Sequence, residues 1–247
     1  MQMLQQAALG LALLLAGSAA HALTAAELVD KNVEAKGGAA ALQSVRSLRR
    51  EGKLIVHGGQ YVMNLVETKQ RPESVRTEVS LQGLSQVQAY DGKEGWRIDP
   101  FGGRKDPERM PADDVREYAE DASIDGVLAD ARAAGSSIEY LGTEDIDGTQ
   151  AHKLKVVRKD GGVQYVYLDP DYFLEIRVES QRTVRGVKRT AVTDYGNYEK
   201  VGGVFWPLSI ESGIKGGGTP AKYEYDSAVV NPELAADYFS FPAAPNK

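Results

Sequence analysis

Residues that could carry out catalysis or bind a metal are few in this sequence, and their spacing fits neither role. Beyond residue 22 there are only two histidines, His57 and His152, and the chain has no cysteine. The histidines do not form an H-x-x-x-H or similar motif, so a zinc ion would need carboxylates as its other ligands. We interpret both histidines as surface or edge residues of strands.

Three short motifs resemble functional sites but fit structural roles better. Glu144–Gly148 (EDIDG) has the start of a calcium loop without its later ligands, so we expect a hairpin turn. Asp113 and Asp114 begin a helical pattern, where acidic side chains stabilise a helix N-terminus. The segment GIKGGGTP lacks both the Gly-Lys-Ser/Thr ending of a phosphate loop and a following helix.

Signatures of nucleophilic catalysis are also missing. The sequence has no G-x-S-x-G motif, and no Ser-His-Asp set has a local signature. This disfavours a hydrolase of envelope lipids. We expect a protein that is not an enzyme and needs no cofactor or metal ion.

The first 22 residues have the pattern of a secretory signal peptide. An apolar run from Ala7 to Ala16 precedes Ala20-His21-Ala22, which matches an A-x-A cleavage site. The run is about half of the roughly 20 residues that a membrane span needs. We expect residues 1–22 to be removed by cleavage after Ala22, with cleavage after Ala20 as the alternative, and residues 23–247 to form a single domain.

Composition places the mature protein in the bacterial periplasm. Without cysteine the chain can carry neither a lipid-modified N-terminal cysteine nor a disulfide, so it is not lipid-anchored and must rely on its core. The mature chain has 247 − 22 = 225 residues and a net charge of −6. An acidic chain without a strong basic cluster argues against nucleic acid as a partner. We expect a monomer.

The chain begins with helices and then changes to strands. Thr24 and Glu27 form a capping box at the start of a helical stripe that Gly37-Gly38 ends. A short helix is expected over Ala39–Val45. From Leu48 the apolar period becomes two, which predicts successive hairpins through residue 99.

The middle of the chain interrupts the strands. PFGGRKDPERMP is expected to be a loop, and the segment after it to be helical in two pieces divided near Ser123–Gly126. After Gly135 strands resume, with turn signals about every 8 to 14 residues. This rhythm predicts an antiparallel meander.

Residues 163–180 pose the question of what covers the second face of the sheet. After the turn at Asp169-Pro170-Asp171, Leu174, Ile176 and Val178 should point inward, and Glu175, Arg177 and Glu179 outward. In the strand before the turn both faces are partly apolar. A sheet this long curls, and its concave face must be covered by the few helices. The mixed strand is therefore either buried core or the wall of a ligand cavity.

Several segments together resemble one protein family. They comprise residues 26–54, AYDGKEGWRIDPFGG, DASIDGVLAD, IEYLGTEDIDGTQAHKLKV, YVYLDPDYFLEIRVES, YEKVGGVFWPLSIES and NPELAADYFSFP. In their order and spacing they span nearly all of the mature chain. The chain resembles the LolA/LolB-like superfamily of periplasmic lipoprotein carriers, in particular outer-membrane lipoprotein-sorting proteins.

The resemblance implies an α+β, mainly β fold: an unclosed antiparallel β-barrel of about eleven strands with a lid of short α-helices. It implies a chaperone that carries a lipid or the acyl chain of a lipoprotein between the inner and outer membranes. Its partners would then be an inner-membrane transporter and an outer-membrane acceptor. Lipoproteins, phospholipids and other apolar molecules all suit such a cavity. Arg46, Arg49 and Arg50 are candidates for the arginine that gates the lid in the true carriers.

Inward-facing apolar side chains are expected to line the cavity. From strands these are Met63, Leu65, Val79, Leu81, Trp96, Tyr165, Tyr167, Trp206 and Ile210, and from the lid Tyr118 and Leu128. Core packing is the alternative for both tryptophans. Gly126 and Gly135 are expected hinges of the lid.

Two further alternatives remain open on the sequence. The basic stretches RSLRREGK and RTVRGVKR are either solvated strand faces or contacts for anionic lipid headgroups. The protein could also be a non-enzymatic sensor or adaptor of the same fold, which binds an envelope protein partner instead of cargo.

Overall fold

The computed structural model describes residues 23–184 and 187–242. The expected signal peptide, residues 1–22, and the centre of the basic stretch RTVRGVKR, residues 185–186, lie outside these ranges. All strands of the described residues belong to one sheet. They are β1 Ser47–Val56, β2 Tyr61–Gln70, β3 Ser74–Leu81, β4 Leu84–Tyr90, β5 Gly95–Asp99, β6 Arg104–Arg109, β7 Ser137–Ile146, β8 Thr149–Val157, β9 Val163–Leu168, β10 Glu175–Val184, β11 Val187–Val201, β12 Val204–Ile214 and β13 Ala221–Val230.

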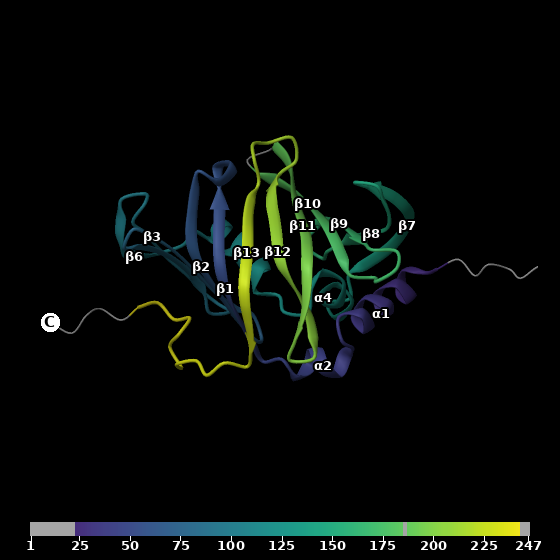
Figure 1. The fold of residues 1–247 in the computed structure, drawn as a ribbon, viewed down its shortest axis with the longest axis horizontal. Coiled ribbons are helices and arrows are strands. Elements are labelled where there is room, and N and C mark those ends of the chain that lie inside the picture. The colour runs from purple at the N-terminus through teal and green to yellow at the C-terminus, as the bar shows by residue number, and fades with distance from the viewer. Residues whose placement is uncertain (1–22, 185–186, 243–247) are drawn as a thin grey trace, which may run out of the picture.

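The sheet is an unclosed antiparallel half-barrel, which confirms the expected fold class (Figure 1). Its order is β6-β5-β4-β3-β2-β1-β13-β12-β11-β10-β9-β8-β7. Sequential neighbours form hairpins, and β1 pairs with β13, so the first and last strands meet in the middle of the sheet. β6 and β7 are left as the two edges.

The sheet has thirteen strands, where about eleven were expected. One difference is β6, which lies in the segment predicted to be a loop. β6 pairs with β5 from Trp96–Arg109 to Asp99–Arg104, and its side chains are mostly exposed. An edge strand is held by backbone hydrogen bonds along one side and needs no apolar face, so the sequence carries no period-two signal there.

The helices are short and follow the expected boundaries. They are α1 Ala25–Ala35, α2 Ala39–Ser44, η1 His57–Gly59, α3 Ala112–Ala119, η2 Glu120–Ala122 and α4 Val127–Ala133. Thr24 and Glu27 form the capping box of α1. Gly37 follows the helix with φ 123°, and a Cβ there would lie 2.3 Å from the Gly203 carbonyl oxygen, so only glycine fits. No helix among the described residues is long and apolar enough to cross a membrane.

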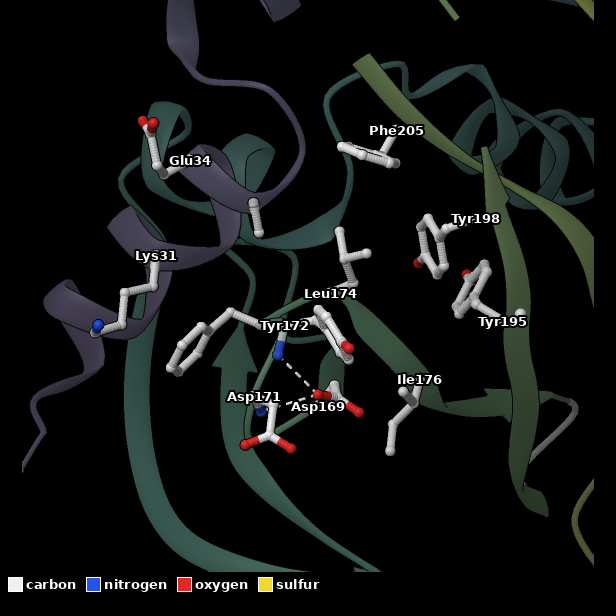
Figure 2. A pocket seen from close by; sticks show the side chains of 13 residues that line it. Lys31, Glu34, Asp169, Asp171, Tyr172, Leu174, Ile176, Tyr195, Tyr198 and Phe205 are labelled. Carbon is white, nitrogen blue, oxygen red and sulfur yellow. Dashed lines mark hydrogen bonds between the residues drawn. The ribbon is translucent and has the colours of Figure 1, made fainter. Parts of the chain in front are cut away.

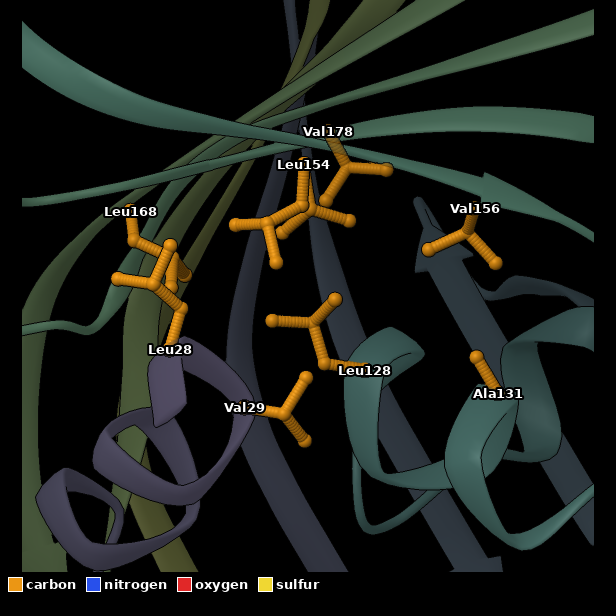
Figure 3. Close-up of a cluster of buried hydrophobic side chains, with 9 residues drawn as sticks. Leu28, Val29, Leu128, Ala131, Leu154, Val156, Leu168 and Val178 are labelled. Atoms are coloured by element: carbon orange, nitrogen blue, oxygen red, sulfur yellow. The ribbon is translucent and has the colours of Figure 1, made fainter. Parts of the chain in front are cut away.

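The helices cover part of the concave face and create the main core. α1 and α4 pack their apolar sides against β8, β9 and β10 (Figure 3). The buried cluster consists of Leu28, Val29, Leu128, Ala131, Leu154, Val156, Val166, Leu168 and Val178. Nearer the β6 edge of the sheet, Tyr118 of α3 and Ala122 of η2 pack against Val75 of β3 and Tyr90 of β4. The insertion between β6 and β7 therefore crosses the concave face.

The outer face of β9 is covered by side chains of the sheet itself. Val166 and Leu168 point into the helix-covered core, so the alternate residues Tyr165 and Tyr167 lie on the opposite face. The Lys153 ammonium lies 4.8 Å and 5.3 Å from the centres of their rings. Tyr167 is fully buried there and donates to Glu144 over 3.4 Å. Both faces of β9 are apolar because both are packed.

The predicted alternation of β10 is wrong at one position. The ladder to β9 shifts register between Glu175 and Arg177, which is a β-bulge. Glu175 was expected to point outward, but it is buried and pairs with Lys36 over 3.3 Å. Val178 points inward as expected and joins the core.

The last described residues form a segment that binds across β1 to β5. Trp96 Nε1 donates to the Phe239 carbonyl over 2.9 Å, and Arg76 donates to the Tyr238 carbonyl over 2.8 Å. The Tyr238 hydroxyl contacts Arg49 and Thr68 over 3.1 Å and 3.2 Å. Trp96 therefore anchors residues 238–241.

We expect Trp96→Phe to release this segment. The change removes the indole N–H, and one lost hydrogen bond should lower the free energy of unfolding by about 1 kcal/mol. Digestion by carboxypeptidase should then proceed into residues 238–241 much faster than in the unchanged protein. Trp206→Phe is the matched control, because it removes the hydrogen bond to the Val201 carbonyl elsewhere in the sheet. Equal digestion of both variants would contradict the anchoring role.

Candidate functional site

A cavity of about 390 Å³ lies between the concave face and the lid. Strands β1 to β4 and β10 to β13 contribute to its floor and walls, and α3, η2 and the Ser123–Gly126 loop supply its roof. The volume lies within the range of small-molecule sites. It is lined by aromatic, hydroxyl and charged side chains together, so it differs from the purely apolar hollow that the resemblance implies.

A buried ion pair forms the floor of this cavity. Arg50 donates from Nη2 to both carboxylate oxygens of Glu67, over 3.1 Å and 2.7 Å, and its guanidinium lies 4.0 Å above the Tyr225 ring. Lys69 lies 3.1 Å from Glu67, and the Tyr225 hydroxyl donates to Glu67 over 2.6 Å. We call Arg50, Glu67 and Lys69 the floor triad. It has two positive charges and one negative charge.

Electrostatics keep the triad ionised. Burial by itself raises the pKa of Glu67, but Arg50, Lys69 and the Tyr225 hydroxyl outweigh it and lower the pKa from 4.5 to about 2. Arg50 remains charged at any relevant pH. Its Nη1 donates to the Pro207 carbonyl over 2.9 Å, whereas its buried Nε has no hydrogen-bond partner in the described part of the chain.

Tyrosines give the cavity wall its hydrogen-bonding groups. Burial raises the pKa of Tyr118, Tyr195 and Tyr223, so these hydroxyls stay protonated. Tyr118 contacts Thr77 and the Gln88 carbonyl over 3.0 Å each. Tyr198 donates to the Glu175 carbonyl over 2.8 Å. The wall combines ring surface with hydroxyl groups.

A second space, an apolar groove of about 760 Å³, lies between α1 and strands β10 to β12 (Figure 2). Phe173, Leu174 and Ile176 line one side, and Tyr195, Tyr198 and Phe205 line the other. Four charged side chains also belong to its lining, namely Lys31 and Glu34 of α1 and Asp169 and Asp171 of the β9–β10 turn, and the Lys31 ammonium lies 4.6 Å from the centre of the Phe173 ring. The groove exists because α1 ends before it can cover this part of the sheet.

The groove and the cavity share a boundary. Tyr195, Tyr198 and Phe205 line both spaces. Burial raises the pKa of Tyr195 and of Tyr198, and the positive charge of Arg50 opposes this effect in both. The floor triad therefore lies close to this boundary. A molecule bound in the groove therefore faces a polar interior beyond three aromatic side chains.

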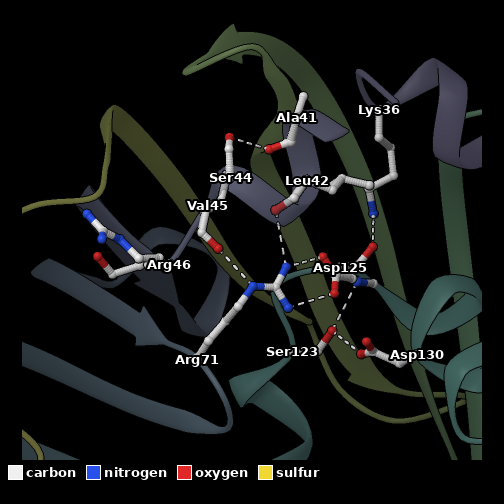
Figure 4. Close-up of polar contacts among 12 residues, drawn as sticks. Lys36, Ala41, Leu42, Ser44, Val45, Arg46, Arg71, Ser123, Asp125 and Asp130 are labelled. Atoms are coloured by element: carbon white, nitrogen blue, oxygen red, sulfur yellow. Dashed lines mark hydrogen bonds and ion pairs between the residues drawn. The ribbon is translucent and has the colours of Figure 1, made fainter. Parts of the chain in front are cut away.

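The lid is fastened by three basic residues from outside it. Arg71 forms a bidentate ion pair with Asp125 and donates to the Val45 and Leu42 carbonyls (Figure 4). Lys36 donates to the Asp125 carbonyl over 2.9 Å as well as to Glu175. Gly126 has a φ of 92°, a left-handed conformation that favours glycine, so glycine lets the loop follow this path beside Lys36. Lys69 adds a third contact, to the Ser123 carbonyl over 3.2 Å.

Inside the loop, Ser123 ties the start of α4 to the fastening. Its hydroxyl donates to Asp130 over 2.5 Å and accepts from the Gly126 amide over 3.0 Å. Burial raises the pKa of Asp130, and the Ser123 hydrogen bond lowers it in part. Gly126 is thus held by contacts on both sides in this closed arrangement, and its role as a hinge stays a prediction.

Four of the eleven side chains expected to line a cavity do line this one. They are Leu65, Tyr118, Trp206 and Ile210. Met63 and Val79 pack in the same hydrophobic cluster as Leu65 without reaching the cavity, and Leu81 lies at the end of β3 beside the hairpin to β4. Leu128 is enclosed in the core under α1 and α4.

The remaining three expected residues lie away from the cavity. Tyr165 and Tyr167 are on the outer face with Lys153, and Trp96 holds the C-terminal segment. Both tryptophans are buried. The side chains that sequence reasoning missed are chiefly polar or aromatic, namely Lys36, Glu67, Lys69, Glu175, Tyr195, Tyr198, Phe205, Tyr223 and Tyr225. The tyrosines at position 195 of β11 and position 223 of β13 were the available signal.

Of the three candidate arginines, only Arg50 lies in the cavity. Arg46 is exposed, and Arg49 pairs with Glu51 and with Tyr238. Arg50 contacts Glu67, Pro207 and Tyr225, which belong to the sheet and not to the lid. The side chain that holds the lid by a bidentate pair is Arg71, which was not among the candidates.

The histidines and the short motifs occupy structural positions. His57 begins the 3-10 turn η1 between β1 and β2, so it lies next to a strand and not within one. His152 in β8 stacks on Phe173 and hydrogen-bonds Tyr140 over 2.9 Å. Asp145 accepts from Gly148 in the β7–β8 turn, and Asp113 and Asp114 lie in the first turn of α3. Within the described ranges, no three His, Asp or Glu side chains gather in a way that could hold a metal ion.

Comparisons with solved structures relate this architecture to known proteins. A LolA superfamily protein from Nitrosomonas europaea aligns with a TM-score of 0.59 and 14% identity over 89% of this chain and 98% of that chain. A protein from Vibrio parahaemolyticus described as an outer membrane lipoprotein-sorting protein domain aligns with a TM-score of 0.60 and 14% identity, over 87% and 97% of the two chains. A DUF1329 family protein from Desulfovibrio piger aligns with a TM-score of 0.60 and 12% identity over the same shares.

These likenesses show that the chain has the fold of LolA superfamily proteins, as the resemblance of its sequence segments predicted. No protein-family model and no curated protein matches the sequence.

The ionised Glu67 makes a prediction for acid stability. Its folded pKa of about 2 is below the usual 4.5, so its contribution is complete above pH 4.5 and is lost as the pH falls towards 2. We expect it to amount to about 3 kcal/mol between pH 5 and pH 2. Urea unfolding at both pH values should show that loss in the unchanged protein and a smaller one in Glu67→Gln. Glu78→Gln removes a half-exposed carboxylate of β3 and is the control, so it should lose as much stability as the unchanged protein. If the unchanged protein lost as little stability as Glu67→Gln, the assignment to Glu67 would be refuted.

The Arg71–Asp125 pair makes a prediction for the lid. Asp125→Asn leaves Arg71 with a neutral partner, so residues 112–126 should exchange amide hydrogens roughly tenfold faster while α4 stays packed. Exchange in β8 and β9 should be unchanged. Asp113→Asn is the matched control, since its partner Arg116 lies on the exposed face of the same insertion. Equal exchange in the two variants would show that Arg71 does not fasten the lid.

Proposed function

We propose that this protein is a periplasmic carrier that binds a lipid or the acyl chain of a lipoprotein and moves it between the inner and outer membranes. The observation that supports this most directly is the apolar groove of about 760 Å³ beside α1. Its lining is mostly aromatic and aliphatic, with Lys31, Glu34, Asp169 and Asp171 as its charged members. Such a lining suits hydrocarbon with a polar end.

The size of the groove gives binding energy without any covalent step. Each buried methylene contributes about 0.8 kcal/mol, so roughly ten of them contribute about 8 kcal/mol. That equals the free energy of a micromolar complex before the cost of ordering the chain is subtracted. An affinity of this size permits both loading and release, which a carrier needs.

Compartment and fold are consistent with this role. The signal-peptide pattern of residues 1–22 and the absence of cysteine suit a soluble periplasmic protein. One structure with the same fold is described as a lipoprotein-sorting protein domain, and another belongs to the LolA superfamily. A carrier in this compartment would receive cargo from an inner-membrane transporter and deliver it to an outer-membrane acceptor.

The lid is the element that would open during exchange. Its fastening consists of hydrogen bonds and ion pairs at one loop, while α4 remains packed in the core. Opening therefore needs the loss of a few polar contacts near Gly126 and not the unfolding of the core. Gly126 and Gly135, both with positive φ, remain the proposed hinges.

A charge in the groove tests the proposal. Ile176→Glu places a carboxylate against hydrocarbon, so binding of a fluorescent long-chain lipid should weaken at least about tenfold. Ile214→Glu is the matched control at an exposed position on β12. Native mass spectrometry of protein purified from envelope extract should show a co-purifying lipid in the control and not in Ile176→Glu.

Two results would count against the carrier role. One is the absence of lipid and of probe binding in the unchanged protein. The other is stable capture of one envelope protein with no exchangeable cargo, which would favour the sensor or adaptor.

A further inference from the structure

The inner cavity differs chemically from the groove that it adjoins. The groove is lined mostly by hydrocarbon and aromatic rings, with Lys31, Glu34, Asp169 and Asp171 as its charged residues, whereas the cavity contains the floor triad and the hydroxyls of Thr193, Ser212 and several tyrosines. Hydrocarbon in the cavity would displace water from Glu67 and Lys69 without replacing its hydrogen bonds, which is costly. The two spaces therefore suit different parts of one molecule.

We propose that the cavity is a binding site for the anionic head group of a single-chain amphiphile whose hydrocarbon lies in the groove. This inference rests on the proposed function and specifies the cargo: a long chain that ends in a carboxylate or phosphate. Tyr195, Tyr198 and Phe205 line both spaces, so such a molecule would pass between their rings.

The charge of the floor triad selects the sign of the head group. Arg50 and Lys69 carry two positive charges and Glu67 carries one negative charge, so the triad has a net charge of +1. Two other carboxylates of the cavity are paired, Glu175 with Lys36 and Glu120 with Arg158 over 2.8 Å, while Asp121 lines the cavity near Tyr118, Tyr195 and Tyr223 and also makes an interaction of its own. An anion beside the triad would compensate its excess charge.

Unused donors mark where the anion would bind. Arg50 is 5% exposed, its Nη1 and Nη2 donate to Pro207 and Glu67, and its Nε is enclosed by protein, so Arg50 supplies charge to the site and not a free donor. Lys69 has three N–H groups and contacts Glu67 and the Ser123 carbonyl, which leaves one for a ligand. The protonated hydroxyl of Tyr195 is a further donor at the shared boundary.

The size of the cavity limits the cargo. About 390 Å³ accommodates a head group but not several acyl chains, and the groove beside α1 provides a path for hydrocarbon. A fatty acid or a lysophospholipid therefore matches the two spaces better than a multiply acylated molecule.

A pair of chain-matched probes tests the head-group site. Palmitate and methyl palmitate have the same hydrocarbon, and only palmitate carries a charge at pH 8. Titration of delipidated full-length protein should give an affinity for palmitate roughly tenfold higher than for the ester. Lysophosphatidylglycerol should behave as palmitate does, and butyrate alone should bind far more weakly, because it lacks the chain.

Two variants with opposite charge changes make the test specific. Lys69→Gln lowers the net charge of the triad, so palmitate affinity should fall about tenfold while ester affinity stays within about twofold. Glu67→Gln raises the net charge and should increase palmitate affinity. Thermal unfolding of each variant confirms that it is folded, and the opposite signs exclude a general loss of structure.

The outcomes separate this inference from the proposed function. Equal affinities for palmitate and its ester, unchanged in both variants, would overturn the head-group site and leave a carrier of hydrocarbon. Butyrate binding as tight as palmitate binding would indicate a small-anion site and overturn the amphiphile. Binding of neither palmitate nor its ester to the unchanged protein would overturn the carrier itself.

Discussion

The chain path between the two edges of the sheet determines most of this structure. β6 and β7 lie at opposite edges of thirteen strands, and the segment that joins them must cross the concave face. It does so as α3, η2 and α4, which pack first on β4 and β5 and finally beside α1 and β7. A lid is thus a consequence of topology. Because the crossing segment and α1 are short, they fill the concave face at its two sides and leave the cavity and the groove between and beside them.

The types of side chain on the concave face also depend on which helices pack against each part of it. Where α1 and α4 lie on β8 to β10, water is excluded and the side chains are Leu and Val. Under α3 and η2, beyond the region that α1 and α4 pack against, the sheet carries Arg50, Glu67 and Lys69 and a wall of tyrosines. Buried ion pairs rarely add stability relative to apolar packing, because both charges must lose their hydration. A triad retained in a cavity that opens toward an apolar groove is better explained by a bound molecule than by the needs of folding.

Local features of the fold were predictable from sequence, and long-range pairings were not. The capping box at Thr24, the stop at Gly37 and the division of the lid near Ser123–Gly126 depend on neighbouring residues only. The bulge at Glu175–Arg177 violates strict alternation, so Glu175 was placed on the wrong face. Trp96 is buried against the distant segment at Phe239, and Tyr167 is buried beside Glu144 of β7. The alternation of one strand shows that such a side chain is buried, but not whether protein or a ligand covers it. Arg71 finds Asp125 across 54 positions of the chain, for which the sequence holds no signal.

Two lysines connect the cavity to the lid. Lys69 contacts both Glu67 in the floor triad and the Ser123 carbonyl in the lid loop, and Lys36 contacts both Glu175 and the Asp125 carbonyl. Each ammonium has a fixed number of N–H donors, so a head group that takes a hydrogen bond from Lys69 competes with the lid for it. Arg71 uses four of its five N–H donors on Asp125 and two carbonyls, and it does not line the cavity. Under the proposed function, cargo therefore acts on the weaker part of the fastening while Arg71 retains the stronger part, and a carrier can exchange its load without losing the packing of α4.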